Sequence, residues 1–204
     1  MKFVKWTFIV LFWLLVAAFL HYTLPQHDVV RITDTYEKRV DPGENSLFWA
    51  QADTGTDGTL PNRDVFFIQT RRDNGEIIVY RNEDTGWGWP PYFKFDTSNL
   101  QAEAADMKST ADNPRWVAVR HYGWRNEFLT IFPNAVGLKQ VAGPDVRIIP
   151  WTAIVILVIL AAVYWAIRVR WKRFWRSRVD PMLEEAGDRL DQGSHRMKGM
   201  FSSK

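Results

Sequence analysis

The sequence predicts a membrane protein in which two transmembrane α-helices flank a mainly β extramembrane domain. Two observations predict this class. Apolar runs lie near both ends of the 204-residue chain, at residues 6–24 and 150–169, and about 20 residues of helix cross the hydrocarbon of a bilayer. Between these runs, residues 25–149 form a more polar segment in which apolar residues recur with a period of two, as in half-buried strands.

The first apolar run, Trp6–Leu24, contains no formal charge and follows Lys2 and Lys5. A cleaved signal peptide is the competing interpretation, because the small residues Val16–Ala18 could serve as a cleavage site. The bulky residues Phe19–Tyr22 extend the run past the length of a signal peptide. They favour an uncleaved signal anchor that remains as a transmembrane helix.

A basic block follows the second apolar run and predicts the orientation of both helices. Its six cationic residues are Arg168, Arg170, Lys172, Arg173, Arg176 and Arg178. Under the positive-inside rule this block stays in the cytoplasm, and Lys2 and Lys5 agree with it at the other end. We therefore expect residues 1–5 and 170–204 in the cytoplasm and residues 25–149 in the periplasm of a bacterial cell, with the block against the anionic cytoplasmic leaflet.

Basic residues interleaved with Trp171, Phe174 and Trp175 are also typical of a nucleic-acid patch. The position directly after an apolar run is explained more simply by a stop-transfer anchor that contacts lipid, so we expect no nucleic-acid partner. Beyond the block, the apolar residues between Asp180 and Leu190 are spaced as in a short amphipathic helix that could dock a partner.

The first half of the central domain predicts three strands. Val30–Lys38 alternates between apolar and polar residues, as a strand with one buried face does. Asp64–Arg72 and Glu76–Arg81 are rich in β-forming residues. The Asp73–Gly75 segment between them predicts a hairpin, because Asn-Gly accepts the positive φ of a tight turn.

The second half of the central domain predicts one short helix and the remaining strands. Ser98 and Gln101 fit a capping box, and the residues behind them are good helix formers. Trp116–Tyr122 predicts a strand, followed by further apolar runs at Phe128–Phe132 and Val136–Val141. The order of elements is that of an OB-like small barrel with one short helix; an open antiparallel sheet or a sandwich is the alternative.

The sequence carries no recognisable catalytic motif and no cysteine. The lack of cysteine excludes disulfides, thiolate metal sites and a cysteine nucleophile. Phosphate-binding glycine loops, HExxH zinc motifs and serine elbows are also missing from the sequence. His121 stands alone in a predicted strand, where histidine is more often packed or hydrogen-bonded than catalytic. The sequence therefore weighs against an enzyme and predicts no cofactor.

One polar loop imitates a calcium-binding loop. Asp53, Asp57 and Asp64 stand at positions one, five and twelve, with Gly58 at position six. Position three lacks an acid or amide, Pro61 occupies position nine, and no helix is predicted on either side. A polar turn before a strand is therefore the favoured interpretation, and the metal site is the alternative.

A second loop, Trp87–Tyr92, combines two glycine-flanked tryptophans, two prolines and a tyrosine. Trp87, Trp89 and Tyr92 could present rings that stack on a sugar or base or that grip a proline-rich peptide. The same rings could cap one end of the domain or rest on the membrane interface, since the domain is tethered at both ends. The structural and interfacial interpretations are favoured.

Several blocks of the chain resemble one bacterial family. They are HYTLPQHDVVRI at the end of the first apolar run, NEDTGWGWPPYFKFDTSNLQAEA, WVAVRHYGWR with FPNAV behind it, and AGPDV before the second run. Together they are similar to the domain-of-unknown-function family 1523, inner-membrane proteins of Gram-negative bacteria. The resemblance implies the same topology and an inner-membrane location. It transfers no activity and no functional residue.

The function expected from the sequence is that of a non-enzymatic inner-membrane envelope protein. Its periplasmic β domain would act as a scaffold or accessory subunit that contacts a membrane protein or a cell-wall component. The alternative is a periplasmic ligand-binding or sensing module that uses the loop Trp87–Tyr92.

Overall fold

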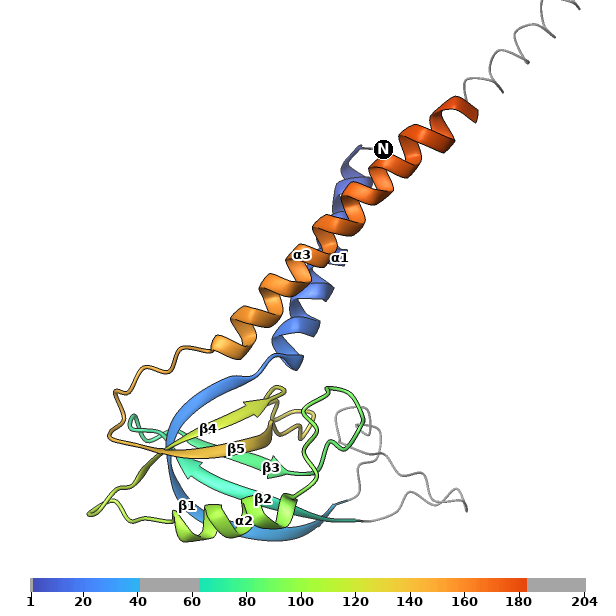
Figure 1. Ribbon diagram of the computed structural model, residues 1–204. Coiled ribbons are helices and arrows are strands. Elements are labelled where there is room, and N and C mark those ends of the chain that lie inside the picture. The colour runs from blue at the N-terminus through green and yellow to red at the C-terminus, as the bar shows by residue number, and fades with distance from the viewer. Residues whose placement is uncertain (1, 41–62, 183–204) are drawn as a thin grey trace, which may run out of the picture. The chain divides into compact units, whose positions relative to one another are not determined.

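The computed structural model describes residues 2–40 and 63–182 (Figure 1). The chain forms two compact units, Met1–Ala153 and Ile154–Lys204, and α3 crosses the boundary between them. The elements in chain order are α1 (Lys2–Thr23), β1 (Gln26–Val40), β2 (Arg63–Arg71), β3 (Ile77–Asn82), α2 (Thr97–Asp106), β4 (Trp116–Tyr122), β5 (Asn134–Val141), α3 (Trp151–Phe174) and a short π-helical segment (Trp175–Val179).

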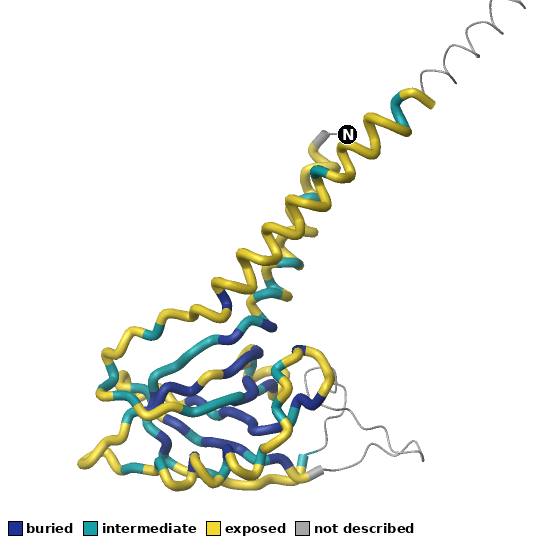
Figure 2. Tube along the Cα trace, viewed as in Figure 1, coloured by how far each residue is buried: buried dark blue, intermediate teal, exposed yellow. Residues whose placement is uncertain are grey.

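The two apolar runs form helices that are long and apolar enough to cross a membrane. Most residues along α1 and α3 are exposed, as Figure 2 shows by their yellow colour. The second helix extends beyond the predicted end at residue 169 and includes four of the six basic residues, while Arg176 and Arg178 lie in the π-helical segment. Lysine and arginine are good helix formers, and no proline lies between Trp151 and Pro181, so the helix continues.

The strands form one mixed sheet in the order β1-β2-β3-β5-β4, and β4 pairs again with β1. The N-terminal part of β1, Gln26–Arg31, pairs with β4, and the remainder pairs with β2 across an irregularity between Ile32 and Asp34. Only one parallel pair, Arg81 with Asn134, joins β3 to β5. The sheet closes on itself but joins β3 to β5 through a single pair, so it is not a regular barrel, and the open antiparallel alternative is wrong because β4 pairs with β1 and β3 runs parallel to β5.

The predicted β2–β3 hairpin is confirmed. Gly75 adopts a positive φ of 84°, which glycine tolerates without steric cost. The Arg72 amide donates to the Glu76 carbonyl at 2.8 Å, and the Asn74 side chain accepts from the Glu76 amide at 3.0 Å. Both contacts are local, so the turn sequence alone was sufficient to predict them.

The helix α2 is confirmed, but its predicted cap is wrong. Asp96 is the N-cap, and its carboxylate accepts from the Asn99 amide at 2.9 Å. Aspartate caps a helix as well as serine does, and a cap two residues earlier includes Thr97 and Ser98 in the helix. Gln101 does not reach back to the helix start; its side-chain oxygen accepts from Asn82 of β3 at 3.0 Å. Leu100 and Ala104 are buried.

The strand predicted at Phe128–Phe132 is wrong. These residues form a tight loop whose only pairing is an isolated bridge between Asn126 and Ile131. Phe128 is fully exposed, and Thr130 adopts a positive φ of 53°, which interrupts an extended conformation. Of the apolar run, Ile131 is the buried residue that anchors the loop. The strand β5 then begins at Asn134.

The core of the domain lies inside the sheet, with α2 covering part of it (Figure 1). Its fully buried members are Val30, Ile32, Ile68, Tyr80, Ala104, Val117, Val119 and Ala135. Val30 and Ile32 show the alternation of β1, which places even-numbered residues of this part of the strand inside and odd-numbered ones outside. The same alternation places Asp28 inside the sheet and His27 outside it.

Candidate functional site at the end of helix α1

Two loops of the β domain contact the C-terminal end of α1. We call residues 83–96 the aromatic loop and residues 123–133 the β4–β5 loop. The Tyr92 hydroxyl donates to the Thr23 carbonyl at 2.6 Å. From the other loop, the Trp124 indole donates to His21 Nδ1 at 2.8 Å. Only Leu24 and Pro25 separate α1 from β1. The covalent connection and the hydrogen bonds from both loops therefore hold the end of α1 on the domain.

Stacked aromatic rings extend this contact into the domain. Tyr92 lies parallel to Tyr122 of β4, with ring centroids 4.8 Å apart and planes 10° apart. Tyr22 of α1 packs edge-on against Tyr122 and Trp124. Gly123 has a φ of 92° and donates its amide to the Tyr22 carbonyl at 2.9 Å. A left-handed residue with the Tyr22 ring beside its α-carbon favours glycine at this position.

Lys94 fixes the base of the aromatic loop. Its ammonium donates to the side-chain oxygen of Asn82 and to the carbonyls of Glu83 and Ala135, the last two at 3.2 and 2.9 Å. Burial lowers the pKa of Lys94 to about 8, against the opposing charges of Asp84 and Glu83. An amine that gives its hydrogen bonds to β3 and β5 holds the loop on the sheet.

The outer side of the aromatic loop is apolar and exposed. Trp87 is 84% exposed, and its ring contacts Phe93 and Phe95 with centroids 5.4 and 5.6 Å away. Trp89 is also exposed and stacks on Phe19 of α1 at 5.7 Å. The three residues predicted as a ring platform therefore do not share one surface. Tyr92 points inward to the helix end, while Trp87 and Trp89 face outward.

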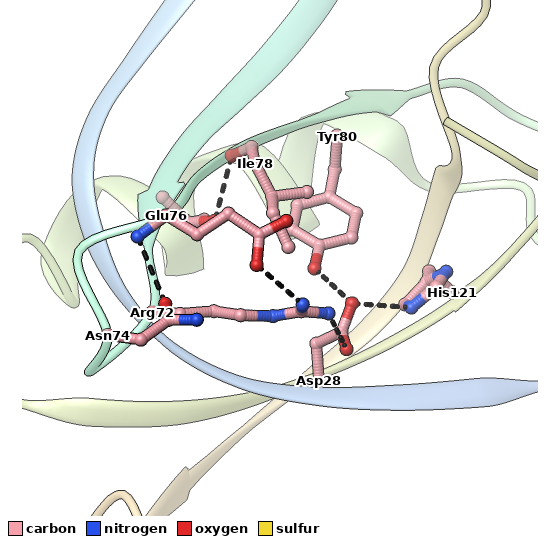
Figure 3. A network of polar contacts seen from close by, with 8 residues as sticks. Asp28, Arg72, Asn74, Glu76, Ile78, Tyr80 and His121 are labelled. Carbon is pink, nitrogen blue, oxygen red and sulfur yellow. Dashed lines mark hydrogen bonds and ion pairs between the residues drawn. The ribbon is translucent and has the colours of Figure 1, made fainter. Parts of the chain in front are cut away.

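A polar network runs from the buried side chains of Tyr80 and His121 to the partly exposed Asp28 and Arg72 and the exposed Glu76 (Figure 3). Asp28 of β1 is its centre: one carboxylate oxygen accepts from Arg72 at 2.6 Å, and the other accepts from the Tyr80 hydroxyl at 2.6 Å. His121 Nε2 lies 2.9 Å from the same second oxygen, although its angle falls outside hydrogen-bond geometry. Glu76 binds the remaining side of the Arg72 guanidinium at 2.9 Å.

The charge of Asp28 is stabilised by these neighbours. Burial alone would raise its pKa, but His121, the Tyr80 hydroxyl and the positive charge of Arg72 together lower the pKa of Asp28 well below its usual value. Burial and the neighbouring Asp28 charge raise the pKa of Tyr80 well above its usual value. At neutral pH the network therefore holds an ionised carboxylate beside a neutral phenol.

A buried ion pair lies beside the junction of β3 and β5. Arg81 lies 3.1 Å from the Glu83 carboxylate, with both side chains almost fully buried. Asn134 of β5 accepts from the Glu83 amide at 2.9 Å and donates to the Glu83 carbonyl at 3.0 Å. These side-chain bonds reinforce the β3–β5 junction, which has only one backbone pair.

The other predicted site residues are distributed as follows. Asp53 and Asp57 lie outside the described residues, while Asp64 is exposed near the start of β2. Within residues 2–40 and 63–182 no group of three acidic or histidine residues could hold a metal ion. The six basic residues of the block are all exposed along α3 and the π-helical segment, where Trp171 packs against Phe174 and Trp175.

Fold and site together define a class: a small mixed β domain bonded to the end of an apolar helix and followed by a second such helix, each able to cross a membrane. The chain belongs to the family described as "Protein of unknown function (DUF1523)", which matches residues 1–175. The match confirms the resemblance seen in the sequence. An uncharacterized protein of Haemophilus influenzae is 38% identical over 142 residues, 70% of this chain and 76% of the relative. No solved structure matches the chain.

Proposed function

We propose that the chain is a non-enzymatic protein of the bacterial inner membrane, a scaffold or accessory subunit of the envelope. In this proposal α1 and α3 span the bilayer, both termini lie in the cytoplasm, and residues 25–149 lie in the periplasm. The sheet would be an OB-like barrel that contacts a membrane protein or a cell-wall component. The strand order with a parallel β3–β5 pair and a helix between β3 and β4 supports this topology.

One observation carries the proposal: the β domain is bonded directly to the end of its helix. Tyr92 and Trp124, from two different loops, bind carbonyl and imidazole acceptors in the last turn of α1. A domain on a flexible linker would sample many orientations, whereas these contacts hold one orientation relative to α1. A fixed orientation is what a scaffold needs in order to present the same surface to a partner in the membrane plane.

The exposed rings of the aromatic loop support a membrane-proximal position. Trp89 stacks on Phe19 of the apolar helix, so a helix that spans the bilayer places this loop at the headgroup level. Tryptophan rings favour that zone because they have an apolar body and a polar N–H. At the other side, the basic block would contact the anionic cytoplasmic leaflet, where each cation contributes about 1 kcal/mol.

Cross-linking followed by purification tests the scaffold role. A photoreactive residue replaces Trp87 in the full chain, and a second variant carries it at Arg115, which is exposed between α2 and β4. We expect one or a few envelope proteins to be cross-linked in stoichiometric amounts from at least one position. Cross-links to lipid alone from both positions, with no protein partner in a mild-detergent purification, would contradict the scaffold proposal.

A second candidate function is a periplasmic ligand-binding or sensing module. The observation that favours it is the exposure of Trp87, which leaves one ring face of the Trp87–Phe93–Phe95 cluster open for stacking. Replacing Trp87 and Trp89 by alanine would then abolish binding of a glycan or peptide in a screen with the full chain. Unchanged binding profiles of the double variant would eliminate the loop as a recognition surface.

A further inference from the structure

A second surface of the domain carries charges that the proposed function does not use. A pocket of about 560 Å³ lies on the outer side of β1, β4 and β5, against the segment that leads to α3. Its volume is within the range of small-molecule sites, roughly 300–1,000 Å³. His27, Arg120, Lys139 and Arg147 supply its polar groups. The pocket therefore gathers basic residues from four separate segments of the chain.

Strand pairing explains why these groups converge. His27 faces Arg120 across β1 and β4, and Lys139 faces Ala118 across β4 and β5, so their side chains share one outer face. Gly137 faces Arg120 and has no side chain, which leaves the Arg120 guanidinium 3.6 Å from the position of a β-carbon. Arg147 joins them from the segment before α3.

The cations of the pocket have no anionic partner within residues 2–40 and 63–182. Arg120, Lys139 and Arg147 are exposed, and none lies within ion-pair distance of a described carboxylate. Asp145 stands two residues before Arg147 but does not line the pocket. Like charges that converge without a counterion repel one another, so a bound anion would lower their energy.

His27 reports the same positive environment. Its Nδ1 atom is buried and has no hydrogen-bond partner in the described part of the chain. Burial lowers the pKa of His27, and the charges of Arg120 and His121 lower it further, although Asp28 acts in the opposite direction. The imidazole therefore lies at the edge of a cluster of cations.

The remaining wall of the pocket is apolar. It consists of Ala118, Leu138, Val141, Val146 and Ile148. A free inorganic anion would use the cations and leave these side chains in contact with water. A ligand that joins an anionic group to a hydrocarbon chain uses both, because apolar contact contributes about 25 cal/mol per Å² removed from water.

The chain connections place the pocket near the ends of both apolar helices. His27 is four residues after Thr23, the last residue of α1, and Ile148 is three residues before Trp151, the first residue of α3. At about 3.3 Å per extended residue, each of these residues lies within roughly 15 Å of a helix end. The headgroup zone of a bilayer begins at those ends if the helices span it.

We propose that this pocket binds the phosphate headgroup of an anionic phospholipid, with the upper part of an acyl chain against its apolar wall. Arg120, Lys139 and Arg147 surround the phosphate, and His27 lines its edge. The inference rests on the proposed membrane insertion of α1 and α3 and adds a specific lipid site on the domain side.

Native mass spectrometry of the full chain in detergent tests the site, with dioleoyl-phosphatidylglycerol and dioleoyl-phosphatidylcholine as probes. We expect one phosphatidylglycerol to be retained in preference to phosphatidylcholine. The variant Arg120→Gln/Lys139→Gln/Arg147→Gln should bind it about 100-fold more weakly, since each cation near an anionic lipid contributes roughly one factor of five. Equal retention by the variant would overturn the site.

The matched control removes the same charge elsewhere. Lys38→Gln/Arg39→Gln/Lys108→Gln takes three exposed cations that do not line the pocket, and should bind phosphatidylglycerol like the wild type. An equal loss in both triple variants would mean that net charge alone attracts the lipid. Water-soluble glycerophosphoglycerol and inorganic phosphate complete the test, and affinities equal to that of the lipid would contradict the acyl-chain contact.

Alkaline carbonate extraction of cell membranes keeps this result separate from the proposed function. A chain released by carbonate would contradict membrane insertion of the two helices while leaving the purified pocket measurable. A chain that stays in the membrane but retains no phosphatidylglycerol would contradict the lipid site alone.

Discussion

Neighbouring residues of β1 and β4 belong to two opposite charge environments. Asp28 and His121 point inside the sheet, where Arg72 and Tyr80 also contact the carboxylate. His27 and Arg120, one position away on the same two strands, point outside into a basic pocket. The inner group pairs its charges, whereas the outer group holds cations that have no described counterion.

The difference separates residues that hold the fold from residues available to a ligand. A charge removed from water destabilises a protein by several kcal/mol unless partners compensate it, so the inner set must be complete in the folded chain. An exposed cation keeps its hydration and needs no partner for folding. Unpaired cations gathered around an apolar wall therefore have no evident structural role, and binding of an anion is the role their chemistry fits.

Replacing Asp28 by alanine should have the largest effect. The change leaves Arg72, His121 and the buried Tyr80 hydroxyl without their shared acceptor, and a hydrogen bond to a charged group contributes about 1.5–3 kcal/mol. We expect the melting temperature of the purified protein to fall by about 3–9 °C at neutral pH. The control Asp34→Ala removes an exposed ion pair with Lys108 and should leave the melting temperature unchanged. Equal shifts in both variants would remove the distinction between inner and outer charges.

The inner network should also make the protein sensitive to acid. The folded-state pKa of Asp28 lies well below the unfolded value of about 3.9. Its contribution is therefore complete above about pH 4 and is lost as the pH falls below that value, by up to about 1.4 kcal/mol per pH unit. Chemical unfolding at pH 6, 4 and 2.5 measures this loss, and Asp28→Asn should flatten the curve. A variant with the same acid slope as the wild type would show that other carboxylates dominate.

The buried Lys94 ammonium donates its hydrogen bonds to uncharged oxygens, and it should make the stability of the fold depend on pH in the alkaline range. Its pKa of about 8 lies below the unfolded value of about 10.4, so the folded chain binds fewer protons between these values. Stability should rise with pH in that window, by roughly 2 kcal/mol between pH 8 and 9.5. Denaturant titrations of the wild type and Lys94→Met compare the slopes. The variant should lack the rise; a rise that persists in it would assign the effect to another group.

The aromatic loop should show the smallest and most local contrast. Tyr92→Phe removes the hydrogen bond to the Thr23 carbonyl and should lower stability by about 1 kcal/mol. Trp87→Ala removes a ring that faces solvent, so it should lower the melting temperature less than Tyr92→Phe does, although it removes many more atoms. Thermal unfolding of both variants in detergent makes the comparison. A larger loss for Trp87→Ala would mean that the outer rings pack in the fold.

The elements with local signals were predictable from the sequence, and the contacts between distant residues were not. Apolar runs, an Asn-Gly turn and period-two alternation each act within a few residues, so the helices, the β2–β3 hairpin and β4 follow from them. The partners of Asp28 lie 44 and 52 residues away along the chain, and no local pattern identifies them. One signal was present: Asp28 shares the alternation of Val30 and Ile32, which predicts an inward carboxylate.

Two errors have the same physical origin. The run Phe128–Phe132 has the composition of a strand, but Phe128 has no place inside the sheet and the positive φ at Thr130 turns the chain. The cap at Ser98 satisfied the local pattern, but Asp96 also satisfies it, and Gln101 binds Asn82 of a distant strand. In both cases tertiary contacts selected among conformations that the local sequence allowed.

Reporter fusions measure the central claim most directly, namely that the β domain lies outside the cytoplasm between two membrane-spanning helices. Alkaline phosphatase joined after Asn113, between α2 and β4, should be active, because the enzyme folds in the oxidising periplasm. The same enzyme joined after Arg178, behind α3 and the basic block, should be inactive, and a green fluorescent protein fused there should fluoresce. An inactive phosphatase after Asn113 together with an active one after Arg178 would contradict the account.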